Sequence, residues 1–410
     1  MAQQKVKYTD TERTPAERAR ALLEEMTLDE KMAQLGCIFP FGDSYDDMEQ
    51  QALEMPYGIG QVSTLEMRRI RTLEEAAGWQ RKMQETVMRQ SPHHIPAIFH
   101  MEGLCGAFIQ EGTSFPSGIA RGSGWDPELE EKIAKVVAKQ EAACGITHIL
   151  APVLDISRDS RMGRHGETYG EDPALAAALG TAYTKGIQTT EAGGRRPESV
   201  AKHFLGFYNS QGGIHGTNSD TPSRLMEEIY GKPFQSAISE SGLKGVMPCY
   251  NSIDGEPASV SHRLLTELLR EKMGFDGLCV SDYGGINNAH EVQRIGETIG
   301  ETGLLAMEAG MDIEMPKATG YGEELKEMFR SGQADTELLD RTVLRVLEAK
   351  FRMGLFEHPF AMDGESCQKI FEKKEGAELS LQSARESMVL LKNNGILPLS
   401  GKIKKLALIG

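Results

Sequence analysis

Short, continuous apolar runs recur along this chain, and a longer segment with helical spacing follows most of them. Continuous rather than alternating apolar residues are typical of strands buried on both faces, as in a parallel sheet covered by helices. We expect strands at 32–39, 58–64, 95–101, 146–154, 199–204, 243–250, 277–281 and 311–315. We expect helices between them at 73–90, 127–144, 173–188, 224–240, 262–273 and 301–310.

Eight such strands predict an α/β fold of the closed (β/α)8 type, a TIM-like barrel. An open doubly wound sheet is the alternative, but no Gly-x-Gly-x-x-Gly follows the first strand. We place an N-terminal extension at 1–20 and the barrel domain at 21–357, followed by a polar linker at 358–376. Residues 377–410 contain a helix and two apolar runs that we expect to be strands. Because an apolar strand needs a partner layer, we interpret 377–410 as the start of an α/β sandwich domain that is mostly absent from this chain.

The chain's acidity excludes several partner classes. Its net charge of −15 argues against nucleic acid and anionic membranes as main partners, because both require a basic face.

The N-terminus lacks the apolar core of a secretory signal, and no run of about 18 apolar residues occurs, so we expect a cytoplasmic protein. The six cysteines are scattered without a Cys-x-x-Cys pair, which favours reduced thiols. No phosphate loop or metal motif is present, and we expect no cofactor and no metal.

Polar side chains stand at the ends of six of the expected strands. They are Glu102, Asp155, Lys202 with His203, Tyr250 with Asn251, Asp282, and Glu314. In an α/β barrel the C-terminal ends of the strands form the open mouth, where catalytic groups lie. One such residue would mean little, but six that converge on one face predict a site, because burying a charge without a partner is costly.

Asp282, in "VSDYGGI", has two interpretations. An aspartate after an apolar strand can cap a following helix. It can also act as a nucleophile that attacks an electrophilic carbon, typically the anomeric carbon of a sugar. Gly284 and Gly285 would then allow a ligand to come close.

Lys202 and His203 lie in "AKHFLG". Lys202 alone could form a Schiff base, as in a barrel aldolase. Adjacent strand residues point to opposite faces, so both can reach one ligand only if the strand is already ending there. Two donors at that point suit hydrogen bonds to neighbouring hydroxyls.

Two further stretches carry charge near strand ends. Arg164 is a candidate fork donor to paired hydroxyls, or an orienting partner for a carboxylate. Glu167 and Glu171 either belong to the same loop chemistry or simply begin the helix that follows Pro173. Glu102, in "FHMEGLCG", could accept two hydrogen bonds from vicinal hydroxyls.

From about Leu22 to Gly410 the chain resembles glycoside hydrolase family 3, the β-glucosidase and β-xylosidase group. The likeness is carried, in order, by "IPAIFHMEG", "LAPVLDISRDSRMGRHGETYGEDP", "AKHFLG", "VMPCYNSIDGEPAS", "GFDGLCVSDYGGI" and "ARESMVLLKNNGILPL".

The resemblance implies a role for each matching residue. Asp282 would be the nucleophile, and Tyr250 would lie beside it. Lys202, His203 and Arg164 would bind sugar hydroxyls in the innermost subsite, and Glu102 would bind distal hydroxyls. Tyr283 stands where tryptophan is commoner, and would give a smaller apolar wall.

The expected function is therefore that of a retaining, exo-acting β-glycosidase with a covalent glycosyl-aspartate intermediate and a small carbohydrate substrate. In two-domain relatives the acid/base is a glutamate of the second domain, so we expect it outside this chain. One alternative is a β-N-acetylglucosaminidase-like hydrolase with His215 as the acid. Others are a non-catalytic sugar-binding fragment and a Lys202 aldolase. Some family members dimerise, which leaves a homodimer open.

Overall fold

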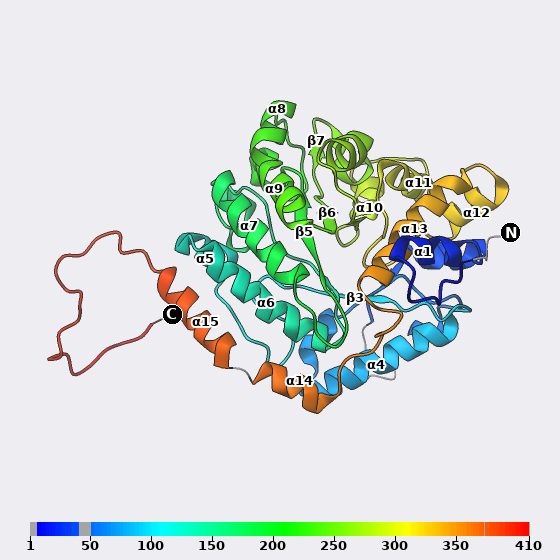
Figure 1. The fold of residues 1–410 in the computed structure, drawn as a ribbon. Coiled ribbons are helices and arrows are strands. Elements are labelled where there is room, and N and C mark those ends of the chain that lie inside the picture. The colour runs from blue at the N-terminus through cyan, green and yellow to red at the C-terminus, as the bar shows by residue number, and fades with distance from the viewer. Residues whose placement is uncertain (1–5, 41–50, 373, 410) are drawn as a thin grey trace.

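The computed structural model describes residues 6–40, 51–372 and 374–409, and its centre is a curled parallel sheet (Figure 1). The order of its seven strands is β1-β2-β3-β4-β5-β6-β9, and each strand is parallel to the next. Their bounds are β1 Cys37–Ile38, β2 Gln61–Ser63, β3 Ile98–Met101, β4 His148–Ile149, β5 Glu198–Phe204, β6 Gly245–Pro248 and β9 Leu278–Cys279. The predicted α/β fold with a parallel sheet is thus confirmed. A small antiparallel hairpin, not predicted, follows β6: β7 Ser252–Ile253 and β8 Glu256–Pro257.

The segment 311–315, predicted as the eighth strand, makes only an isolated bridge, yet it contacts both edges of the sheet. Ile313 pairs with Val280, just after β9. The Glu314 N–H donates to the Leu35 carbonyl, just before β1, at 3.0 Å. Hydrogen bonds therefore run through this segment from the last strand of the sheet to the first.

Helices follow the strands and cover the outside of the sheet (Figure 1). Their bounds are α1 Pro15–Leu23, α2 Leu28–Ala33, α4 Leu73–Gln90, α5 Gly118–Gly124, α6 Pro127–Ala143, α7 Pro173–Gln188, α8 Ser223–Leu225, α9 Lys232–Ser241, α10 Gly285–Asn287, α11 Ile299–Ala309, α12 Glu323–Ser331, α13 Thr336–Arg352, α14 Gly364–Phe371 and α15 Lys374–Glu386. The helices predicted at 73–90 and 173–188 have the predicted bounds. Their starts are fixed by side-chain caps, Thr72 with Glu75 for α4 and Asp172 for α7.

The C-terminal part differs from the prediction. The expected linker, 358–376, contains α14, which buries Cys367 and Phe371 against α4 and α6. In the described residues after α15, 387–409, there is no strand, so the two strands expected there are wrong. Apolar side chains such as Leu391 and Leu408 are exposed along this segment, which loops away from the other elements (Figure 1). Without a neighbouring strand, an apolar run has no ladder to join. The domain boundaries themselves stay a prediction.

A buried ion cluster fixes the segment 311–315 to its neighbours. The Asp312 side chain is fully buried, and its Oδ2 lies 2.7 Å from Arg270 Nη2 and 2.8 Å from the Cys279 N–H. Its Oδ1 accepts from Arg345 Nε at 2.6 Å. Asp312 thus joins β9, α13 and the helical segment Arg263–Lys272 through one carboxylate.

A buried lysine makes the stability of the chain depend on pH. Lys350 of α13 is 0% exposed and donates to Gln34 Oε1 at 2.6 Å. Burial lowers the pKa of Lys350 to about 7, against an ordinary value of about 10.4. Between these two values the unfolded chain binds more protons than the folded chain, so the free energy of unfolding should rise with pH.

Lys350→Met should therefore stabilise the protein more at neutral pH than at alkaline pH. At pH 7 the gain should be roughly 2 kcal/mol, because removing the ionisation penalty outweighs the lost hydrogen bond to Gln34. At pH 10 the gain should vanish. Urea unfolding at both pH values measures this, with the exposed Lys369→Met as the control. An equal change at both pH values would contradict the prediction.

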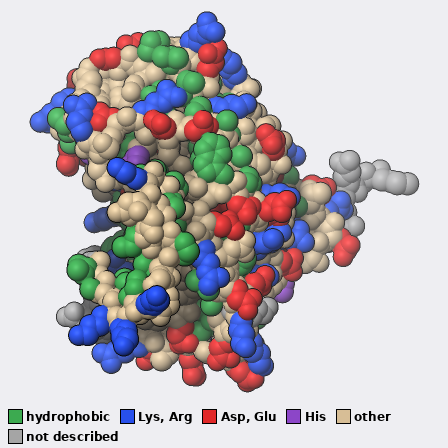
Figure 2. All heavy atoms as spheres, turned by 90° about the vertical axis from the view of Figure 1, so that its left-hand side faces the viewer, with side chains coloured by type: hydrophobic (Ala, Val, Ile, Leu, Met, Phe, Trp, Pro, Cys, Tyr) green, Lys and Arg blue, Asp and Glu red, His purple; other side chains and the backbone are tan. Residues whose placement is uncertain are grey.

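Charges of both signs are interspersed over the face shown in Figure 2, without a uniformly basic area. Among the described helices, none combines the length and apolarity needed to cross a bilayer.

Candidate active site

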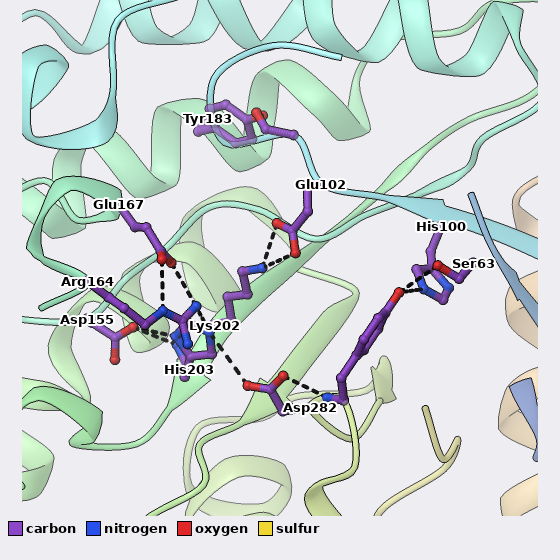
Figure 3. A network of polar contacts seen from close by, with 12 residues as sticks. Ser63, His100, Glu102, Asp155, Arg164, Glu167, Tyr183, Lys202, His203 and Asp282 are labelled. Carbon is purple, nitrogen blue, oxygen red and sulfur yellow. Dashed lines mark hydrogen bonds and ion pairs between the residues drawn. The ribbon is translucent and has the colours of Figure 1, made fainter. Parts of the chain in front are cut away.

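The residues predicted to form a site meet at the C-terminal ends of the strands (Figure 3). Glu102 directly follows β3, Lys202 and His203 lie near the end of β5, and Asp282 follows β9. In Figure 3 their side chains point toward one another, together with Arg164 from the loop after β4. The predicted convergence at the mouth is therefore present for these residues.

Lys202 and His203 both reach the mouth although they are neighbours in β5. The strand ends one residue after His203, at Phe204, which is the predicted end. The pairing of β5 with β6 is irregular between Lys202 and Phe204, where the register shifts. Such an irregularity interrupts the alternation of faces, so two adjacent side chains can serve the same site.

Lys202 is held by Glu102. Its Nζ lies 2.8 Å from Glu102 Oε1 and 2.7 Å from Oε2, and only 3% of the Lys202 side chain is exposed. The Glu102 side chain is 23% exposed, so it forms the solvent side of the pair. An ammonium that donates to a carboxylate in this way is fixed as a charged hydrogen-bond donor.

His203 is oriented by Asp155. Asp155 Oδ2 lies 2.7 Å from His203 Nδ1 and also accepts the His203 backbone N–H at 3.0 Å. Burial is the main cause that lowers the pKa of His203, and Arg164 and Lys202 lower it further. The neutral ring then donates from Nδ1 to Asp155, and its Nε2 accepts from Arg164 Nη2 at 3.1 Å.

Arg164 is oriented by Glu167. The guanidinium Nε and Nη2 each lie 2.8 Å from a Glu167 oxygen, in a two-pronged pair. The guanidinium also lies 5.2 Å from the centre of the Phe207 ring. The alternative that Glu167 begins the next helix is wrong, because Asp172 caps α7. Both Nε and Nη2 are engaged, and Nη1 has no hydrogen bond to the described residues.

Asp282 presents one held and one unbonded oxygen. Its Oδ1 lies 2.7 Å from the Tyr283 N–H and 2.8 Å from the Tyr250 hydroxyl. Its Oδ2 has no hydrogen bond to the described residues and lies 3.7 Å from His203 Nε2. Burial raises the pKa of Asp282, while Lys202 and the two donors to Oδ1 work against that rise. The helix-cap alternative is wrong, because Gly284 is the capping residue of α10 and no side chain caps it.

Two of the strand-end residues do not join the site. Glu314 accepts the backbone N–H groups of Thr319, Gly320 and Tyr321 and so shapes its own loop. Asn251 donates to the Phe207 carbonyl at 3.1 Å.

His215, the alternative acid, lies against the rings of Phe207 and Tyr250, with centroids 5.1 Å away in each case.

The state of His215 bears on its role as an acid. Partial burial, with Arg164 nearby, lowers the pKa of His215. This favours the neutral ring at neutral pH, whereas an acid must carry a proton.

The model of the glycosyl hydrolase family 3 N-terminal domain matches residues 27–349. This chain belongs to glycoside hydrolase family 3.

Relatives in family 3 have similar sequences and folds. A β-xylosidase of Formosa agariphila is 34% identical over 334 residues, which cover 77% of this chain and 46% of that protein. A β-glucosidase of Rhizobium radiobacter is 34% identical, with coverages of 73% and 34%. The solved structure of a β-glucosidase from Erythrobacter marinus has a TM-score of 0.89 at 32% identity and covers 96% of this chain and 52% of that one. The chain spans about half the length of these relatives or less.

Sequence reasoning missed two residues of this family 3 site, Ser63 and His100. The Tyr283 hydroxyl lies 2.7 Å from both Ser63 Oγ and His100 Nε2. Both residues lie inside apolar runs, in β2 and β3. The signal that could have identified Ser63 and His100 is a polar residue near the end of a buried strand. In the described part of the chain, no group of three or more His, Cys, Asp or Glu residues could hold a metal ion.

Proposed function

We propose that this chain carries the nucleophile and the innermost sugar subsite of a retaining β-glycosidase. The observation that carries the proposal is the geometry of Asp282. One oxygen is held by two donors, and the other is unbonded among the described residues and faces Lys202, His203 and Arg164. A carboxylate fixed in this way has one oxygen ready to attack and a surround of donors for sugar hydroxyls.

In the first step, Asp282 Oδ2 forms a bond to the anomeric carbon while the bond from that carbon to the leaving oxygen breaks. The leaving oxygen takes a proton, and water later attacks the same carbon and releases Asp282 as a carboxylate. Nη1 of Arg164 and the ammonium of Lys202 would donate to hydroxyls of the sugar, and Glu102 would accept from them. The substrate we propose is a terminal β-glucoside or β-xyloside, because relatives bear both names.

The proton for the leaving oxygen requires a second carboxyl group about 5–5.5 Å from Asp282. Around Asp282, Glu102 is bound by Lys202 and Glu167 by Arg164. Each of these two carboxyl groups is therefore already paired with a basic side chain. We propose, as the resemblance implies, that the acid/base is a glutamate of a second domain.

The test uses substrates that need little protonation. A 2,4-dinitrophenyl 2-deoxy-2-fluoro-β-glucoside or β-xyloside should label the 410-residue protein once, seen as a mass increase that maps to Asp282. Because only the ionised carboxylate attacks, the labelling rate should fall as pH drops through the pKa of Asp282. That midpoint should lie above the ordinary aspartate value of about 3.9, since burial raises the pKa.

The outcomes separate the alternatives. A sugar binder without a competent nucleophile would bind the reagent and show no mass increase. An aldolase would instead be trapped on Lys202 by borohydride and a carbonyl substrate. Labelling of a residue other than Asp282 would overturn the proposal.

A further inference from the structure

The phenol of Tyr283 reaches from the end of β9 to the ends of β2 and β3. Its oxygen lies 2.7 Å from Ser63 Oγ and 2.7 Å from His100 Nε2. Ser63 and His100 are register partners on neighbouring strands, so their side chains leave the sheet on the same face. Tyr283 therefore ties the loop that carries Asp282 to a distant part of the sheet.

The phenol proton of Tyr283 is committed within this trio. Burial is the main cause that lowers the pKa of His100 to about 3, and His148 and Lys202 contribute. The imidazole is therefore neutral and carries one N–H, while Ser63 and Tyr283 each carry one O–H. In either tautomer of His100, one neighbour donates to the phenol oxygen and the phenol donates to the other. The phenol proton is thus used within the trio.

The backbone of Tyr283 contacts the Asp282 carboxylate directly and also through the Tyr250 hydroxyl. Its N–H donates to Asp282 Oδ1 at 2.7 Å, and its carbonyl lies 2.8 Å from the Tyr250 hydroxyl, the other group on Oδ1. On either side, the Ser281 and Gly284 N–H groups donate to the carbonyls of Ile313 and Met315. The main chain is thus fixed to segment 311–315, and the side chain of residue 283 is fixed to β2 and β3.

We propose that Ser63 and His100 are positioning residues for Asp282, because they hold the Tyr283 phenol and through it the peptide N–H that binds Asp282 Oδ1. The proposal rests on the proposed nucleophilic role of Asp282. Without the anchor, the Tyr283 peptide is held only by the bonds of Ser281, Gly284 and Tyr250, so its N–H can shift and Oδ1 loses part of a hydrogen bond that favours its charged form.

The decisive variant is Tyr283→Phe, examined by the pH dependence of labelling with the 2-fluoro reagent. Losing a donor raises the pKa of a carboxylate, so the acid limb should move to higher pH by on the order of half a unit. The other titratable or charged groups that interact with Asp282 are unchanged; they are Lys202, His203, Arg164, Tyr250, His215 and Cys249. The maximal labelling rate should fall about three- to tenfold, as expected for a misplaced nucleophile, while the reagent concentration for half-maximal labelling stays nearly constant.

Tyr321→Phe is the matched control. Its hydroxyl is also buried and donates to the Met311 carbonyl at 2.9 Å, away from Asp282. This variant should lose stability and keep the acid limb of the wild type. If Tyr283→Phe likewise loses stability without a shift of its acid limb, the phenol only packs and the proposal fails.

Ser63→Ala is a second, milder variant that tests the same proposal. It can be used if Tyr283→Phe does not fold. It should shift the acid limb in the same direction, and in the Tyr283→Phe background it should add nothing, because it acts through the phenol. Additive effects would overturn the proposal. The wild type decides the underlying function separately: if it is not labelled at all, the nucleophile assignment itself is wrong.

Discussion

Replacing Asp282 with glycine should lower labelling and turnover of activated β-glycosides by several orders of magnitude. The reason is that Asp282 Oδ2 is unbonded among the described residues, lies 3.7 Å from His203 Nε2 and is acted on by the charges of Lys202 and Arg164. Losing one member of a cooperating catalytic set typically has an effect of this size. Release of dinitrophenolate from the fluorinated and the unmodified glycosides, followed at saturating reagent, measures it.

Azide then tests whether the carboxylate is a nucleophile rather than a structural charge. In Asp282→Gly, azide should attack the anomeric carbon from the vacated side and yield the α-glycosyl azide, because a single displacement inverts a β-glycoside. Asp254→Gly is the matched control, since Asp254 is exposed and its φ of 54° suits glycine. Wild-type rates in Asp282→Gly, or a β-azide product, would rule out the assigned chemistry.

The second large effect is on stability. Asp312→Ala should lower the free energy of unfolding by about 3–5 kcal/mol, because it leaves the charges of Arg270 and Arg345 facing an apolar site without their partner. Urea unfolding followed by circular dichroism measures the change. Asp312→Asn keeps the size and one acceptor, so its loss should be smaller. If Asp312→Ala unfolds at the wild-type urea concentration, the carboxylate does not hold the two arginines in the way the structure implies.

Much of the fold and part of the site follow from local sequence. Each strand of the seven-stranded sheet lies in or overlaps a predicted apolar run, and helix α7 begins at Pro173, as predicted. Asp282, Lys202 and Glu102 could be found because each stands at the end of such a run. Local pattern suffices for these features because burial on both faces and capping are decided within a few residues of the chain.

What escaped prediction depends on contacts between distant segments. Asp155 and His203 are 48 positions apart, and Tyr283 is 220 positions from Ser63. No spacing in the sequence indicates that such side chains meet. The strands expected after α15 fail for the same reason, since an apolar run becomes a strand only beside another strand. The irregular pairing of β5 is likewise a property of two strands and not of "AKHFLG" alone.

The pairing of charges around Asp282 has a consequence for inhibitors. Glu102 and Glu167 are each neutralised by a directly bonded base, and His203 is uncharged beside Asp155. Among the described residues of the mouth, Asp155 and Asp282 have no bonded cation, and of the two the Asp282 side chain is the more exposed, at 13% against 1%. A sugar mimic with a protonated nitrogen in place of its anomeric carbon would put a positive charge directly against the Asp282 carboxylate. It should bind more tightly than the neutral sugar of the same shape, and its advantage should shrink once Asp282 is esterified.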